Sequence, residues 1–130
     1  MDEKVKYWLD IAKYDIETAK VMLDANRYLY VGFMCHQSIE KILKAYYVKT
    51  LNETPPFTHN LMKLADDSKI IDKMSDEYQI FLAEINPLNI KARYPSYREK
   101  ISNKLNKDEC TELFNKTEEV IAWIKVELLK

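Results

Sequence analysis

The chain contains a single glycine, Gly32, among its 130 residues. Tight hairpins, dinucleotide-binding turns and phosphate-binding loops depend on glycine, because glycine adopts positive φ angles without steric cost. A chain with one glycine therefore has few places for such turns. This scarcity predicts helices joined by a small number of connections, and it excludes the glycine-rich phosphate-binding motifs.

The composition is that of one globular domain covering residues 1–130. Hydrophobic residues make up 47% and charged residues 32%, and the formal net charge is −1. This charge gives no overall attraction to nucleic acid or to an anionic membrane. No apolar run approaches the roughly 20 residues that a membrane span needs, and the charged start, Met1 to Lys4, lacks the apolar segment of a signal peptide. We therefore expect a cytoplasmic protein that does not enter a membrane.

The two cysteines, Cys35 and Cys110, lie far apart in the sequence and form no CxxC motif. We interpret them as reduced thiols that serve as small core residues. A zinc site needs about four ligands close together, and only Cys35 and His36 are adjacent. We expect neither a metal nor a cofactor.

Apolar residues recur at steps of three and four along five segments, which is the pattern of amphipathic helices. The three long segments are residues 2–25, 28–50 and 106–129. The two short ones are residues 59–67 and 76–89, and the first of these follows a linker that two prolines make rigid. Because short loops favour antiparallel neighbours, the sequence predicts an all-α, up-and-down antiparallel bundle of three long and two short helices. The expected N-terminal caps are Asp2, Thr58, Ser75 and Asn106.

A polar strip interrupts the most apolar of these segments, residues 28–50. At 100° per residue its members share an arc of roughly 100°, and Glu40 and Lys44 have the favourable i,i+4 order for an ion pair. The strip has two interpretations: the solvated side of an amphipathic helix, or the lining of a groove or subunit interface. We call these four residues the polar strip: Gln37, Glu40, Lys41 and Lys44.

Two further places carry residues suited to ligand contact. His59 follows an expected cap at a helix start, where the positive end of the helix dipole favours an anion. The segment from Arg93 to Arg98 holds two arginines and the tyrosines Tyr94 and Tyr97, which suit phosphate and base contacts. For His59, the structural alternative is a histidine that closes the linker onto the bundle. For the segment from Arg93 to Arg98, the alternative is a loop whose tyrosines pack on the bundle. If the segment folds over residues 28–50, then Arg93 joins the polar strip in one cleft.

No nucleophile–base–acid triad can be assembled from the sequence. The chain has two histidines, and no third partner is indicated for either. We interpret His36 as a half-buried structural histidine beside the polar strip.

Several short motifs occur in a fixed order, and in order and spacing they resemble the HEPN domain (higher eukaryotes and prokaryotes nucleotide-binding). The resemblance covers nearly the whole chain. Each motif alone is weak, and the combination is fairly specific. The motifs are Ala12-Lys13-Tyr14-Asp15-Ile16-Glu17-Thr18-Ala19, Tyr28 and Phe33, Gln37-Ser38-Ile39-Glu40-Lys41-Ile42-Leu43-Lys44-Ala45, Thr58-His59-Asn60-Leu61 with Leu64, and Ala92-Arg93-Tyr94-Pro95.

The resemblance implies a helical bundle that usually forms a homodimer and, in prokaryotes, often stands beside a separate minimal nucleotidyltransferase. Many relatives are ribonucleases, including toxins of toxin–antitoxin systems, in which an arginine precedes a histidine by four to six intervening residues. This chain departs from that motif, because eight residues separate Arg27 from His36 and no histidine follows Arg93 or Arg98.

The predicted function is therefore a non-catalytic module that binds a nucleotide or nucleotidyl substrate and acts with a nucleotidyltransferase chain. The alternatives are a ribonuclease toxin, which would bind RNA, and a pure interaction subunit with the polar strip as a dimer seam. No catalytic residue is assigned. The predicted binding residues are Gln37, Glu40, Lys41, Lys44, His59, Arg93, Tyr94 and Tyr97.

Overall fold

The computed structural model describes residues 1–91 and 106–130, and the regular elements in these ranges are helices. The predicted all-α bundle is thereby confirmed. Its three long helices agree with the predicted segments to within two residues at each end. In chain order the elements are α1 (Glu3–Asp24), α2 (Tyr28–Leu51), α3 (Leu61–Asp67), the 3₁₀ helix η1 (Ile70–Lys73), α4 (Asp76–Ile85), α5 (Leu88–Lys91) and α7 (Lys107–Leu129).

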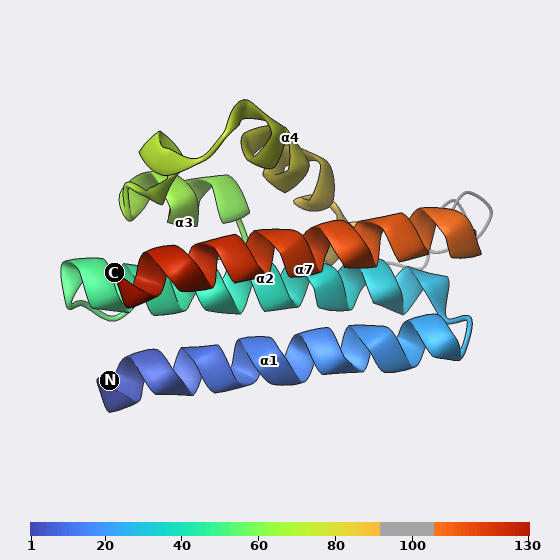
Figure 1. The fold of residues 1–130 in the computed structure, drawn as a ribbon, viewed down its shortest axis with the longest axis horizontal. Helices are drawn as coiled ribbons and strands as arrows, with labels where there is room; N and C mark the ends of the chain where they lie inside the picture. The colour runs from blue at the N-terminus through green and yellow to red at the C-terminus, as the bar shows by residue number, and fades with distance from the viewer. Residues whose placement is uncertain (92–105) are drawn as a thin grey trace.

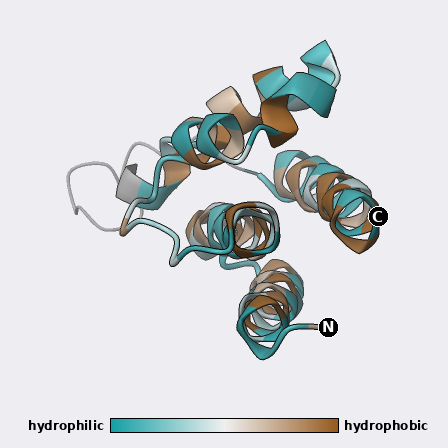
Figure 2. Ribbon diagram, turned by 90° about the vertical axis from the view of Figure 1, so that its left-hand side faces the viewer, coloured by the Kyte–Doolittle hydropathy of each residue, from teal (hydrophilic) through white to brown (hydrophobic). Residues whose placement is uncertain are grey.

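Helix α2 is the centre of the molecule. Figure 2, a view along the long helices, shows α2 with α1 on one side, α7 on another and the short helices on a third. Side chains on several faces of α2 are therefore buried, including Ile39, Ile42 and Leu43, which are almost completely shielded from solvent. A helix that is apolar around most of its circumference is stable only with neighbours on several sides.

The direction of α7 differs from the antiparallel pattern expected for neighbours. Helices α1 and α2 run antiparallel, but α2 and α7 run in the same direction (Figure 1). The thiol of Cys110, near the start of α7, contacts the carbonyl of Tyr28 at the start of α2. The ammonium of Lys49 donates to the carbonyl of Leu128, which joins the two ends. The reason is that the chain between α2 and α7 is long enough to return to the start of α2.

The short helices pack over α2 and explain its glycine. A Cβ placed on Gly32 would lie 3.1 Å from Cδ1 of Leu88, the first residue of α5. That distance is shorter than an ordinary van der Waals contact, so the absent side chain lets α5 approach α2 closely. Helix α5 is thereby held beside the first half of α2, next to the polar strip.

Helix starts follow the expected capping chemistry with one correction. The side chains of Asp2, Ser75 and Asn106 cap α1, α4 and α7 as predicted. Helix α3 is capped by Asn60 instead of Thr58, and its side chain accepts from the amides of Met62 and Lys63. The Asn86-Pro87 pair divides the predicted helix 76–89 into α4 and α5, because proline cannot continue the helical hydrogen bonds.

Among the described residues, no helix combines the length and the apolar character that crossing a membrane requires.

Candidate functional site

The polar strip of α2 is buried, which overturns its interpretation as a solvated helix face. Glu40 has no exposed surface, Gln37 and Lys44 are also buried, and Lys41 reaches the surface with 17% of its side chain exposed. Charged side chains are rarely buried unless they are paired. The strip is therefore an internal network, and its partners come from elements on both sides of α2.

The carboxylate of Glu40 is the centre of this network. Its Oε2 accepts from Lys41 Nζ at 2.8 Å and from Lys44 Nζ at 3.1 Å. Its Oε1 accepts from Nδ1 of His59 at 2.7 Å. Two ammonium groups from the same helix and one imidazole from the segment before α3 thus share one carboxylate. We call Glu40, Lys41, Lys44 and His59 the Glu40 cluster.

The ionisation of Glu40 follows from these contacts. Burial alone would raise the pKa of its carboxyl, because a low-dielectric interior disfavours the charged form. The hydrogen bonds from Lys41 and His59, together with the charges of Lys41 and Lys44, outweigh burial and bring the pKa below its ordinary value. Glu40 is therefore a carboxylate at neutral pH, and its oxygens are acceptors only.

Helix α1 closes the cluster from the other side. The ammonium of Lys44 lies 5.3 Å from the centroid of the Trp8 ring, within the range of a cation–π contact. Asp15 is buried on the same side, and burial raises the pKa of its carboxyl. The positive charge of Lys41 lowers that pKa and the negative charge of Glu40 raises it further, so Asp15 is electrostatically part of the same site.

His36 is fully buried next to the cluster, not half-buried as expected. Its Nε2 donates to the carbonyl of His59 at 3.0 Å, and its Nδ1 faces the amide of Gln37. Burial lowers the pKa of His36 to about 4 despite the nearby charge of Glu40. His36 is therefore neutral at physiological pH, and its role is to hold the backbone that presents His59.

Gln37 connects the cluster to α5. Its amide donates to Asn89 Oδ1 at 3.0 Å, and its oxygen accepts from Lys41 Nζ at 3.3 Å. This contact places α5 beside the polar strip. The chain continues from the end of α5 toward Arg93. Arg93, Tyr94 and Tyr97 lie outside the described residues, and their place in the site stays a prediction.

The structure thus brings together five of the eight predicted residues, Gln37, Glu40, Lys41, Lys44 and His59. Sequence reasoning missed Trp8, Asp15 and Asn89. The spacing of Asp15 from Ala12 and Ala19 puts it on the buried face of α1, and that spacing was the available signal. For Trp8, nothing local in the sequence distinguishes a site residue from a core residue.

Two members of the cluster reach solvent. The side chain of His59 is 49% exposed and that of Lys41 is 17% exposed, while Lys44 and Glu40 stay inside. Because Nδ1 of His59 donates to the carboxylate, a neutral ring carries Nε2 as an acceptor. The surface of the site therefore offers one ammonium and one imidazole, both oriented by a buried carboxylate. Across residues 1–91 and 106–130, no group of three or more His, Cys, Asp or Glu side chains is placed to hold a metal ion.

Comparisons with known proteins identify the family and the fold. The family model described as HEPN domain matches residues 5–127. The crystal structure of TT1696 from Thermus thermophilus superposes with a TM-score of 0.79, covering 94% of this chain and 96% of that chain. The sequence identity is 16%, so this likeness is one of fold. No curated protein sequence matches the chain.

We expect the free energy of unfolding to fall between pH 6.5 and pH 4 because of His36. Its pKa of about 4 in the folded protein lies below the ordinary 6.5, so the unfolded chain binds a proton first as the pH falls. The neutral form of His36 contributes its full stabilisation above pH 6.5, and on the order of 3 kcal/mol of this stabilisation is lost by pH 4. Urea titrations at several pH values measure this loss in the free energy of unfolding. His36→Gln should flatten this dependence; equal slopes for native protein and His36→Gln would contradict the assignment.

Replacing Glu40 with alanine should destabilise the fold strongly. The substitution leaves the buried ammonium of Lys44 without its carboxylate, which costs roughly 3–5 kcal/mol for a buried pair. The matched control is Asp24→Ala, which removes the exposed i,i+4 partner of Lys20 and should cost less than about 1 kcal/mol. Thermal and urea unfolding of both variants compare the two ion pairs, and a similar small loss in both would contradict the central role of Glu40.

Proposed function

Because the chain belongs to the HEPN domain family, we propose that it is a non-catalytic module that binds a nucleotide or nucleotidyl substrate for a separate minimal nucleotidyltransferase. The observation that carries this proposal is the Glu40 cluster: one buried carboxylate orients a lysine and a histidine that both reach the surface. Lys41 and His59 are the described residues that would meet phosphate oxygens.

The charge of the cluster suits an anion. Glu40 contributes one negative charge, and Lys41 and Lys44 contribute two positive charges, so these three groups carry a net positive charge even with His59 neutral. Asp15 is also part of the site, and burial raises the pKa of its carboxyl, which disfavours a second negative charge. The cations are held in place before a ligand arrives, which lowers the entropy cost of binding. A phosphate at the surface would accept from Lys41, while Lys44 keeps the buried carboxylate compensated.

The remaining predicted residues have supporting roles in this proposal. Gln37 and Glu40 orient the ammonium of Lys41 through their oxygens. Arg93 would add a guanidinium, and Tyr94 and Tyr97 would add aromatic faces, as predicted from the sequence. The nucleotidyltransferase partner and the cytoplasmic location also stay predictions. A gene for such an enzyme beside the gene for this chain would support the pairing.

Calorimetric titration with ATP tests the binding proposal. Lys41→Ala should weaken binding about tenfold or more, because a charge-assisted hydrogen bond to phosphate is lost. Lys20→Ala is the matched control: Lys20 also makes an ion pair on a helix surface, lies outside the cluster and should leave affinity unchanged. If the native chain binds no nucleotide, alone or with a nucleotidyltransferase, the proposal is wrong.

A ribonuclease is the second candidate, and one contact favours it. The 2.7 Å hydrogen bond between His59 and the buried Glu40 is the pairing of a base with an orienting carboxylate. His36 is too buried to reach RNA, and the spacing of Arg27 to His36 departs from the family's ribonuclease motif. Any cleavage would therefore depend on His59.

Incubation of purified protein with RNA separates the two candidates. The binding proposal predicts no cleavage. The ribonuclease candidate predicts cleavage that His59→Ala abolishes and that Lys63→Ala, a change on the exposed side of α3, leaves intact. Cleavage that survives His59→Ala and is absent from a mock preparation would contradict both the non-catalytic proposal and the assignment of cleavage to His59.

A homodimer is the assembly that we propose for the chain. Tyr7, Tyr14 and Val21 are exposed on α1 at intervals of seven residues, on the side opposite its core-facing residues. Seven-residue spacing keeps apolar side chains along one line of a helix, as in helix–helix seams. This line is an apolar surface that a second copy could cover.

Sedimentation equilibrium tests this assembly. The native chain should sediment as a dimer, and Tyr14→Glu should shift it toward the monomer by placing a charge in the apolar seam. Phe57→Glu changes a fully exposed aromatic residue outside α1 and should leave the dimer intact. A monomeric native chain would contradict the proposal.

A further inference from the structure

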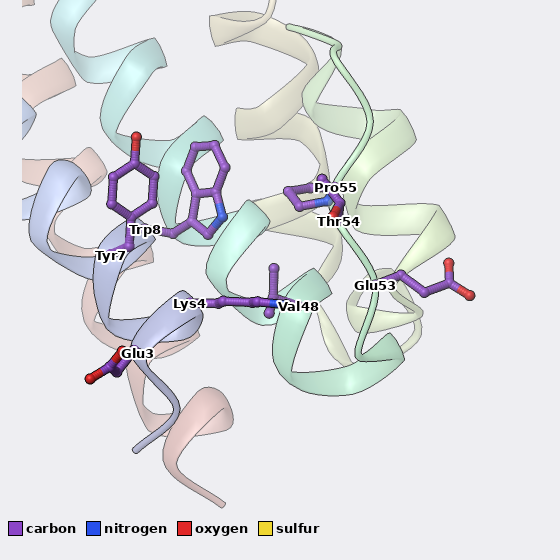
Figure 3. Close-up of a pocket in the computed structure, with 8 residues that line it drawn as sticks. All are labelled: Glu3, Lys4, Tyr7, Trp8, Val48, Glu53, Thr54 and Pro55. Carbon is purple, nitrogen blue, oxygen red and sulfur yellow. The ribbon is translucent and has the colours of Figure 1, made fainter.

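A pocket of about 310 Å³ lies next to the Glu40 cluster, between the first turns of α1, the end of α2 and the linker that follows α2. Figure 3 shows this pocket with its lining side chains. None of its lining residues belongs to the predicted binding set. They are Glu3, Lys4, Tyr7, Trp8, Val48, Glu53, Thr54 and Pro55.

The walls of the pocket are suited to a flat ring. The indole of Trp8 stands on the α1 side, Pro55 lies across from it on the linker, and Val48 lies beneath them (Figure 3). Tyr7 packs edge-on against Trp8, with ring centroids 5.2 Å apart, and so restricts the tilt of the indole. The carboxylates of Glu3 and Glu53 point away from the space between these walls (Figure 3).

Trp8 joins this pocket to the Glu40 cluster. The same indole that lines the pocket has the ammonium of Lys44 5.3 Å from its centroid, and that ammonium is bonded to Glu40. Along α2, Val48 in the pocket and Lys41 in the cluster are seven residues apart, which is about 10 Å of helix. The linker contributes to both places as well, since Thr54 and Pro55 line the pocket and His59 bonds to Glu40.

The volume limits what the pocket can hold. Pockets for complete small ligands span roughly 300–1,000 Å³, so 310 Å³ is room for one ring system without its polar extensions. Any charged part of the ligand must therefore lie outside. The nearest oriented cations along α2 are those of the Glu40 cluster.

We propose that this pocket is the base subsite of the nucleotide site: the base stacks on Trp8, and the phosphates extend along α2 to Lys41 and His59. The inference rests on the proposed nucleotide binding and adds the residues that would hold the base. Stacking on an aromatic face is favourable for every base, so Trp8 supplies affinity. Specificity among bases would come from two polar residues that line the pocket, Thr54 and Lys4.

Fluorescence of single-tryptophan variants tests this inference. Trp123→Phe leaves Trp8 as the only tryptophan, and Trp8→Phe leaves Trp123, which packs on Tyr78 away from the pocket. Each variant is titrated with the four ribonucleoside triphosphates and with tripolyphosphate, which has no base. We expect at least one nucleotide to quench Trp8, no nucleotide to quench Trp123, and tripolyphosphate to quench neither.

Filling the pocket separates the base from the phosphates. Thr54→Phe places an aromatic ring in the space opposite Trp8 and should weaken nucleotide binding about tenfold or more while tripolyphosphate binding stays the same. Nucleotide binding that is unchanged in Thr54→Phe and does not quench Trp8 would overturn the base subsite and leave the proposed function standing. If neither nucleotide nor tripolyphosphate binds the native chain, the proposed function and this inference both fail. The tryptophan pair decides the question even if Thr54→Phe does not fold.

Discussion

The buried carboxylate of Glu40 is the interaction on which the arrangement of the site depends. It has no exposed surface and accepts from two lysines and a histidine. A carboxylate in the interior is costly unless its oxygens are satisfied by cations and hydrogen bonds. The positions of Lys41, Lys44 and His59 are therefore constrained together, and the segment before α3 is held where His59 can reach α2.

The same network ties three separate parts of the chain to α2. Trp8 and Asp15 come from α1, His59 from the segment before α3, and Asn89 from α5. A buried network in which some polar groups lack partners would cost more free energy than an apolar core, so every member must find its partner. This requirement gives the bundle a defined register at its centre, and it keeps charged groups next to a surface that a ligand can reach.

Much of the fold could be predicted from the sequence, because helices are encoded locally. The long helices, the caps at Asp2, Ser75 and Asn106, and the family pattern all follow from spacing and residue type. The site was only partly predictable. The i,i+4 pair of Glu40 and Lys44 is visible in the sequence, but the burial of that pair depends on the other parts of the chain that pack against α2.

The sequence by itself therefore determined the helical class, the boundaries of the three long helices and the polar residues on α2. Only the tertiary structure decided that these residues are internal, that His59 bonds to Glu40 while Asp15 lies within its electrostatic influence, and that α7 runs parallel to α2. The physical reason is distance along the chain. Periodicity and capping act over a few residues, whereas burial and the contacts of Glu40 depend on elements that meet only when the chain is folded.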